Sequence, residues 1–486
     1  MNTKIRNLEP KALWNHFCDL NAVPRPSKKE ERVIKFMVDF GTTLNLETIV
    51  DKVGNVIIKK PATKGLENRK TIVLQSHLDM VHQKNNNKNF DFDTQGIEML
   101  IQEDWVTANG TTLGADNGLG VAAIMAVLSS TDIEHPNLEA LFTIDEETGM
   151  TGAMGLDSNI LKGDILLNLD TEEDDEIGMG CAGGVDITAK RSYKEEKTPE
   201  NVIAYQITVK GLQGGHSGMD IHKGLGNANK IMNRVLFDGF NKFGLRIAEI
   251  NGGSLRNAIP RESVAKIIIN SSSEDGFINE ISEFIEPIKK ELLLIEPNLQ
   301  IEASKIAIPE KVMEISAQES VIKAIYAALN GVYKMSLAIP DLVETSNNIA
   351  KITVKNGQIE VLCLTRSSSE SSKNDLAKSL KSCFELADFK VDFSGTYPGW
   401  QPNINSEILT VVSNLYEKLH GEKAKVAACH AGLECGILGE HYPKMDMVSF
   451  GPTIRGAHSP DERVSISSVQ KFWKFLIEIL KNIPKK

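Results

Sequence analysis

Four short apolar runs in the first third of the chain limit its fold more than any other feature. They lie at residues 55–59, 71–75, 140–144 and 165–169, and they enclose a helical pattern that begins near Asn117. Runs that are apolar on both faces and alternate with helices are typical of a buried, mostly parallel sheet. We therefore expect an α/β fold for this part of the chain.

A different pattern follows residues 183–184. Strands with alternating polarity are expected at 204–209 and 264–269, with a helical stretch between them at 224–237. These elements predict a separate α+β domain. A comparable set of elements at 315–391 makes this domain a candidate for a duplicated unit, although the sequence shows no residue-level repeat.

The chain returns to the first pattern after residues 397–400. Helices are expected at 406–420 and again near the end of the chain, and they complete the first domain. We expect a domain built from two segments, residues 1–184 and 397–486, interrupted by an inserted α+β domain at residues 185–396. A chain of 486 residues also exceeds the size at which a single core keeps growing.

Charge and composition exclude several classes of partner. The formal net charge of -11 would repel a phosphate backbone, so nucleic acid is not an expected partner. The first residues carry charges where an export signal needs an apolar run, and no stretch is long and apolar enough to span a bilayer. The six cysteines lack CxxC pairing and are expected to be reduced. The sequence predicts a cytoplasmic protein with no membrane partner.

Side chains that can bind metal follow the apolar runs. His77 and Asp79 come just past the second run, at the edge of an α/β sheet where sites form. His77 can ligate a metal through one ring nitrogen while Asp79 accepts a hydrogen bond from the other. A solvated loop histidine explains these residues equally well, so the HxD pattern alone decides nothing.

More acidic residues stand in similar places. Asp116 lies at the start of the helix near residue 117, where an N-cap is the simpler interpretation. Glu146 and Glu147 follow the third run and can divide labour, one binding metal and one moving protons, although most acidic pairs are solvated turns. Asp170 follows the fourth run, and the acidic run 172–176 after it is expected to form a solvated turn.

A histidine near the C-terminus, His458, completes the set. Together these positions offer His, Asp, Glu, Asp and His side chains, the nitrogen and oxygen ligands that suit zinc. Two ions that share one carboxylate polarise a carbonyl and lower the pKa of a bridging water, which a nearby glutamate can deprotonate. The pattern therefore favours a hydrolase with a dinuclear metal centre.

The order of the motifs resembles a known group of enzymes, the metal-dependent dipeptidase and aminoacylase clan. Over nearly the whole chain the matching motifs are, in order, IVLQSHLDMV, TTLGADNGLG, FTIDEETGMTGA, LLNLDTE and GAHSPDE. Within the clan the chain is most similar to the aminoacyl-histidine dipeptidases, through CAGG at 181–184, GLQGGHSG at 211–218 and CHAGLECG at 429–436.

The resemblance implies a fold and a metal content. The two-segment domain would be a zinc-peptidase catalytic domain with a mixed, mostly parallel sheet, and the inserted α+β domain would be a lid. Each subunit would hold two Zn²⁺ ions, for which Co²⁺ or Mn²⁺ can substitute. Asp116 would bridge the two ions. His77 and Asp170 would complete one site, and Glu147 and His458 would complete the other.

The resemblance also implies roles in catalysis. Glu146 would take the proton from the bridging water and pass it to the leaving amine. Asp79 would orient His77. The peptide bond between Asp116 and Asn117 is expected to be cis, as is common in this clan.

Substrate-binding residues are implied as well, most of them in the lid. His216 would steady the oxyanion, although a surface-loop histidine between glycines is the alternative. Asn257 and Arg366 would hold the terminal carboxylate of the substrate, for which a bidentate guanidinium is well suited. Gly432 and Glu434 would line the same pocket from the catalytic domain.

The expected reaction is the hydrolysis of dipeptides, preferentially Xaa-His substrates that resemble carnosine. Arg256 and Arg261 lie close to Asn257 in the sequence, so the choice of the carboxylate-binding arginine stays open. The oligomeric state also stays open, because a duplicated lid could replace a partner subunit or coexist with one in a homodimer.

Other functions compete with this interpretation. An N-acyl amino acid deacylase or a carboxypeptidase of the same clan would use the same metal ligands. A noncatalytic peptide-binding scaffold would be expected to lack Glu146 or a ligand, and neither is lost here. A cysteine hydrolase that pairs Cys429 with His430 is disfavoured, because adjacent residues of an extended segment point to opposite sides.

Overall fold

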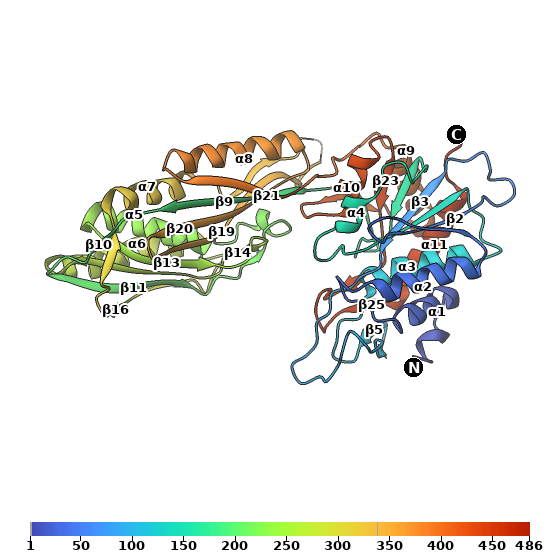
Figure 1. Ribbon diagram of the computed structural model, residues 1–486, viewed down its shortest axis with the longest axis horizontal. Coiled ribbons are helices and arrows are strands. Elements are labelled where there is room, and N and C mark those ends of the chain that lie inside the picture. Colours follow the sequence, from blue (N-terminus) through green and yellow to red (C-terminus); the bar gives the residue numbers. More distant parts are fainter. Residues whose placement is uncertain (1, 338) are drawn as a thin grey trace. The chain divides into compact units, whose positions relative to one another are not determined.

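The structure is a computed structural model that describes residues 2–337 and 339–486, and it divides into two compact units (Figure 1). Unit 1 contains the chain up to Gly180 together with Trp400–Ala428 and Leu433–Lys486. Unit 2 contains Cys181–Gly399 and the short segment Cys429–Gly432.

The segment Cys429–Gly432 was expected in the two-segment domain, but its contacts assign it to unit 2. The backbone N–H of Ala182 donates to the carbonyls of Cys429 and Ala431. The side chain of His430 bonds to Ser346, with 2.7 Å between Nε2 and Oγ.

Unit 1 contains an eight-stranded sheet with the order β1-β2-β6-β3-β7-β23-β8-β22. Its strands are β1 (Glu47–Val50), β2 (Val56–Lys60), β3 (Ile72–His77), β6 (Leu138–Thr143), β7 (Ile165–Asn168), β8 (Glu176–Cys181), β22 (Lys425–Cys429) and β23 (Asp446–Ser449). The neighbours β6, β3, β7 and β23 run parallel, whereas β1, β2 and β8 pair antiparallel. The mixed sheet with a parallel centre confirms the expected α/β class.

Helix α3 (Ala115–Ser129) explains why the first apolar pattern forms a buried layer. Nearly all of its residues are buried, and it packs against both β3 and α1 (Lys11–Leu20). A helix that is apolar on all sides can only be stable when it is covered on all sides. The remaining helices of this unit are α2 (Glu31–Thr43), α4 (Thr151–Gly155), α9 (Glu407–His420), α10 (Glu434–His441) and α11 (Ile466–Lys481).

A small second sheet in unit 1 was not expected from the sequence. It has the order β24-β25-β5-β4 and joins β4 (Met99–Gln102) and β5 (Trp105–Ala108) to β24 (Ile454–Arg455) and β25 (Arg463–Ser465). His458 lies in the loop between β24 and β25. The sheet therefore fixes a loop near the C-terminus against an N-terminal part of the chain.

Unit 2 contains a nine-stranded antiparallel sheet made of two halves with the same β-α-β-β-α-β order. The first half comprises β11 (Val202–Lys210), α5 (Ala228–Phe243), β13 (Arg246–Gly253), β15 (Ser263–Asn270), α6 (Glu274–Leu292) and β16 (Gln300–Ile306). The second comprises β9 (Gly183–Ser192), α7 (Ile315–Ala327), β19 (Val343–Lys355), β20 (Gln358–Ser367), α8 (Glu370–Glu385) and β21 (Lys390–Tyr397), and β18 (Gly331–Met335) pairs with β19. The repeated strand order bears out a duplicated unit, with the first half inserted between β9 and α7 of the second.

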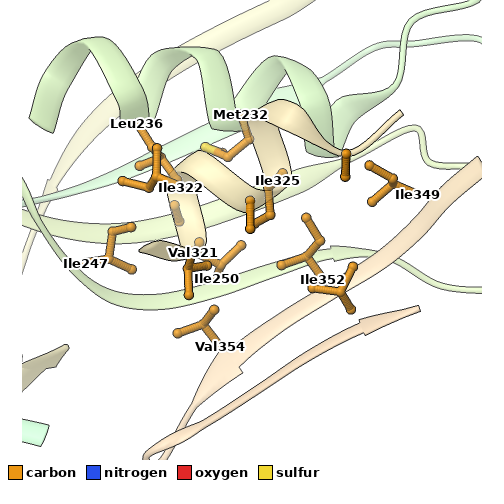
Figure 2. Close-up of a cluster of buried hydrophobic side chains, with 14 of the residues drawn as sticks. Met232, Leu236, Ile247, Ile250, Val321, Ile322, Ile325, Ile349, Ile352 and Val354 are labelled. Atoms are coloured by element: carbon orange, nitrogen blue, oxygen red, sulfur yellow. The ribbon is translucent and has the colours of Figure 1, made fainter. Parts of the chain in front are cut away.

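The two halves meet where β13 pairs antiparallel with β19. Figure 2 shows the core at this junction, where Met232 and Leu236 of α5 and Val321 and Ile325 of α7 lie over the strands. Ile250, Ile352 and neighbouring apolar residues of β13 and β19 complete the cluster. One continuous core thus spans both halves. Among the described helices, none is long and apolar enough to cross a bilayer.

Gly253 at this junction provides a test of the packing. It has φ +74°, and a Cβ there would lie 1.8 Å from the carbonyl oxygen of Ala350 in β19. Gly253→Ala should lower the free energy of unfolding by about 1–3 kcal/mol more than Gly244→Ala, because overpacking adds to the shared backbone strain. Gly244 is a matched control, since it has φ +61° and a Cβ there would have no atom within 4 Å. Urea unfolding measures both values, and equal losses would contradict the close approach.

Candidate active site

The expected metal ligands of unit 1 gather at the carboxyl edge of its parallel strands. His77 is the last residue of β3, rather than lying past its end, and Asp170 comes two residues after β7. Glu146 and Glu147 follow β6. Because β6, β3 and β7 are parallel neighbours, their carboxyl ends lie at the same edge of the sheet.

Two groups of donor atoms meet at Asp116, in the first turn of α3. In the first group, Nε2 of His77 lies 3.2 Å from Oδ1 of Asp116 and 3.6 Å from Oδ1 of Asp170. In the second group, Nε2 of His458 lies 3.2 Å from Oδ2 of Asp116 and 2.9 Å from Oε2 of Glu147. Each oxygen of the Asp116 carboxylate therefore faces a different histidine.

The chemistry of this donor set fits two divalent cations. Four carboxylates, those of Asp116, Glu146, Glu147 and Asp170, are largely buried close to only two imidazoles. Burial raises the pKa of Glu146, Glu147 and Asp170, which shows how unfavourable their charges are in this environment. Oε1 of Glu147 is buried without a hydrogen-bond partner among the described residues. Cations bound to these nitrogen and oxygen ligands would balance the charge.

Asp79 connects His77 to the acidic loop. Its Oδ1 lies 3.3 Å from Nδ1 of His77 and accepts a hydrogen bond of 3.0 Å from the backbone N–H of Glu146. Its Oδ2 accepts a hydrogen bond of 3.3 Å from the N–H of Glu147. A proton on Nδ1 leaves the lone pair of Nε2 directed at Asp116 and Asp170, the state that a metal ligand needs.

Asn117 joins the start of α3 to the end of β7. The Asp116-Asn117 peptide bond is cis, which confirms the expectation. The side-chain amide of Asn117 donates to the carbonyl of Leu169 at 3.0 Å and to the carboxylate of Asp170. Asp116 has non-helical dihedral angles and caps no helix with its side chain, since the N-cap position belongs to Gly114.

Glu434 belongs to a buried polar row beneath the strand ends. Its Oε2 accepts hydrogen bonds of 2.6 Å from Gln75 of β3 and from Thr143 of β6. Asn168 of β7 donates to Gln75 and extends the row. Glu434 is fully buried, and burial raises its pKa to about 8. The structure therefore places this residue inside unit 1, against the strand that carries His77.

The sequence did not predict the environment of three charged residues of unit 1, Glu172, Arg25 and Glu462. Glu172 was expected in a solvated turn, but it is only partly exposed, and burial together with the charges of Asp116 and Asp170 raises its pKa to about 8. Arg25 and Glu462 are buried charged residues that bond mainly to backbone groups of the segments carrying His77 and Asp116, and Arg25 also donates to the side chain of Asn21. Glu462 stands in the GAHSPDE motif, but no side-chain pattern in the sequence reveals a partner that is backbone.

In unit 2, Arg366 is a buried guanidinium that faces neutral groups. It is 5% exposed, donates to the hydroxyl of Tyr397 at 2.7 Å, and has Oγ of Ser217 at 3.5 Å from Nε. Among the described residues no carboxylate forms an ion pair with it. A buried cation that no carboxylate contacts directly is suited to an anionic ligand.

The other two candidate arginines have protein partners. Arg256 donates to the carbonyls of Ile187 and Cys363, both at 2.9 Å, and forms an ion pair with Asp186 at 3.2 Å. Arg261 donates to the carbonyl of Leu212. The contacts of these residues favour Arg366 as the group that binds a carboxylate.

His216 is held as a neutral hydrogen-bond donor. Its Nδ1 accepts hydrogen bonds from the backbone N–H groups of Gly218 at 3.2 Å and Met219 at 3.0 Å, so the ring proton resides on Nε2. Burial and the charge of Arg366 lower the pKa of His216 to about 4. At neutral pH this imidazole can donate through Nε2 but carries no charge.

The remaining expected residues of unit 2 lie around the loop that contains His216, Ser217 and Gly218. Asn257 is exposed, and its carbonyl accepts a hydrogen bond of 2.8 Å from the N–H of Ser217. Gly432 is partly exposed in the segment 429–432. This segment passes close to Gly218, since a Cβ added at Gly218 would lie 2.0 Å from the carbonyl oxygen of His430. His216, Asn257, Arg366 and Gly432 are thus connected through Ser217 and Gly218.

Comparisons with known proteins point to one family. The model of "Peptidase family M20/M25/M40" matches residues 73–482. The cytosol non-specific dipeptidase of Escherichia coli (strain K12) is 43% identical over 484 residues, which cover 100% of both chains. The crystal structure of aminoacylhistidine dipeptidase from Vibrio alginolyticus superposes with a TM-score of 0.93 at 46% identity and covers 99% of this chain and 98% of that one. Aminopeptidase PepT from Bacillus cereus, at 16% identity, a TM-score of 0.58 and coverage of 98% and 99%, shares the fold.

The neutral state of His216 is testable by titration. Arg366→Gln should raise the pKa of His216 from about 4 toward its ordinary value of 6.5, because it removes a charge that opposes protonation. Since the folded state resists a proton that the unfolded chain accepts, this histidine makes the free energy of unfolding fall as the pH drops from about 6.5 to about 4. NMR of ¹³C-labelled histidine rings measures the pKa, with the resonance assigned by His216→Gln. Arg261→Gln is the control, and an unchanged pKa in Arg366→Gln would refute the coupling.

Proposed function

The chain belongs to peptidase family M20/M25/M40, and we propose that it is a dipeptidase that prefers dipeptides ending in histidine and uses two zinc ions. Membership confirms the resemblance found in the motifs, and it makes the protein a metal-dependent hydrolase of peptide bonds. One observation carries the proposal: two donor groups share the carboxylate of Asp116. The names of two full-length relatives, a non-specific dipeptidase and an aminoacylhistidine dipeptidase, support dipeptides as the substrate class, and the second name supports the preference for histidine.

The proposal assigns the donor groups to two ions. His77, Asp170 and Asp116 would hold one ion, and Glu147, His458 and Asp116 would hold the other. Bound there, the ions would polarise the scissile carbonyl and favour ionisation of the attacking water. Asp79 keeps the proton of His77 on Nδ1, so that Nε2 is available as a ligand.

Glu146 is the proposed general base. Its Oε2 lies 4.0 Å from Nε2 of His77, and it forms a further possible donor group with His77 and Glu147. Because the proposal already assigns His77 and Glu147 to one ion each, Glu146 is left free to act on the water. Burial raises the pKa of Glu146 well above its ordinary value. A carboxylate in this state can take the proton of the attacking water and return it to the leaving amine.

Unit 2 would recognise the substrate. Its buried Arg366 is suited to the terminal carboxylate, with Asn257 beside the same loop, and the Nε2–H of His216 is suited to the developing oxyanion. Gly432 would add a substrate contact, whereas the buried Glu434 would support the site from beneath the strand ends. The lid role of unit 2, a cytosolic location and assembly as a homodimer are further parts of this proposal.

The first experiment separates the base from its neighbour. Metal-free protein should regain cleavage of Xaa-His dipeptides when zinc is added, and N-acyl amino acids should remain poor substrates. Glu146→Gln should lower kcat by about 100- to 10,000-fold, the usual contribution of a general base, and retain two metal ions per chain. The adjacent Glu147→Gln is the matched control, which should instead lose metal.

Steady-state kinetics and metal analysis give these values. Turnover of acyl substrates alone would replace the proposal with a deacylase. Inactivity toward every substrate, with metal bound, would favour a peptide-binding scaffold.

A second experiment tests Arg366. Arg366→Gln should raise KM for a dipeptide about 10- to 150-fold, since a hydrogen bond to a charged group contributes about 1.5–3 kcal/mol. The same variant should bind the C-terminal amide of that dipeptide as weakly as the wild type does, because the amide has no carboxylate to lose. Equal losses on both substrates would show that Arg366 does not bind the terminal carboxylate.

A further inference from the structure

The carboxylate of Glu462 binds the backbone of the loop that carries Asp116. Its Oε2 accepts hydrogen bonds from the N–H groups of Leu113 at 2.7 Å and Gly114 at 3.0 Å. Its Oε1 accepts from Ala115 at 2.7 Å and Asp116 at 3.2 Å. One buried carboxylate therefore binds four consecutive backbone donors, the last of which belongs to the residue shared by both donor groups.

Arg25 binds carbonyl groups of two ligand loops. Its Nη2 donates to the carbonyl of Gly114 at 2.6 Å and to the side-chain oxygen of Asn21 at 3.0 Å. Its Nη1 donates to the carbonyls of Leu78 at 3.0 Å and Asp79 at 3.1 Å, directly after His77. Arg25 is 1% exposed, so the guanidinium is placed by these contacts and not by solvent.

The two charges meet at a single peptide group. The carbonyl of Gly114 accepts from Arg25, and the N–H of Ala115 in the same peptide unit donates to Glu462. In a trans peptide these two groups point in opposite directions, so the cation and the anion hold the unit from opposite sides. Hydrogen bonds in such a chain polarise and strengthen each other.

The glycines of the loop are needed for this arrangement. Gly114 has φ +69°, and a Cβ there would lie 2.5 Å from Nη2 of Arg25. At Gly118 a Cβ would lie 2.6 Å from the same atom. The LGADNG sequence thus leaves room for a guanidinium in contact with the start of α3.

We propose that Arg25 and Glu462 act together as positioning residues, a clamp that sets the Asp116 carboxylate between the two histidines. The clamp joins three of the ligand-bearing segments, those of His77, Asp116 and His458, because Glu462 lies four residues after His458 and Arg25 bonds the residues that follow His77. This inference rests on the proposed metal centre. Neither residue touches the donor atoms themselves, so their effect on metal binding acts through the backbone.

Metal binding by the full chain tests the clamp. Glu462→Gln keeps the size of the side chain, but its amide NH₂ would face two of the backbone donors. We expect Co²⁺ to bind about 10- to 100-fold more weakly than to the wild type, the usual effect of losing a residue that orients metal ligands. Titration of the metal-free protein with Co²⁺, followed by the visible absorption of the bound ion, gives affinity and coordination without any activity measurement.

Glu139→Gln is the matched control. Glu139 is also a buried carboxylate of unit 1 that accepts backbone hydrogen bonds, from Lys162 at 2.7 Å and Gly163 at 2.9 Å, at the other end of β6 from the site. It should lower the thermal stability and leave Co²⁺ affinity and the absorption spectrum unchanged. Glu462→Asp, which keeps the charge but shortens the reach, should bind Co²⁺ with intermediate affinity and serves if Glu462→Gln does not fold.

The outcomes separate the clamp from the proposed function. Wild-type Co²⁺ affinity in both Glu462 variants, or equal weakening in Glu139→Gln, overturns the clamp alone. Failure of the wild-type protein to bind Co²⁺ overturns the metal centre and the clamp with it. Weakened binding and an altered spectrum confined to the Glu462 variants support the clamp.

Discussion

Repulsion among buried carboxylates is the constraint on which the rest of unit 1 depends. Parallel strands bring their carboxyl ends to one edge, and there Asp116, Glu146, Glu147 and Asp170 are held with little access to water. Such a cluster is stable only where cations, histidines and backbone dipoles oppose its charge. The polar row that ends at Glu434 and the cis peptide beside Asp116 both lie within this region.

The sequence was sufficient to predict the buried layers of unit 1. Apolar runs identified β2, β3, β6 and β7 to within a few residues, because a strand that is covered on both faces is apolar over most of its length. It was not sufficient for β24 and β25, which are two and three residues long and are too short to show periodicity. Their pairing with β5 is a long-range contact that no local pattern encodes.

The site was predictable to the extent that its chemistry is carried by side chains. His77, Asp116, Glu147, Asp170 and His458 could be chosen because they together form a nitrogen and oxygen ligand set and because their motifs match those of a known clan, and the structure brings them together. Arg25 could not be chosen, since most of its partners are backbone carbonyl groups that every residue possesses. Glu172 was misjudged because an acidic run normally indicates solvent, whereas here its first residue turns toward the site.

The position of β23 in the sheet has a consequence for how the protein is made. This strand, Asp446–Ser449, pairs with β7 on one side and β8 on the other, although β7 and β8 precede it by more than 260 residues. During synthesis the whole of unit 2 is therefore made while the central sheet of unit 1 still lacks β23. An unfilled gap between strands exposes unpaired backbone groups to other chains. The segment that carries β7 and β8 must stay soluble in that unfinished form until Asp446–Ser449 emerges and closes the sheet.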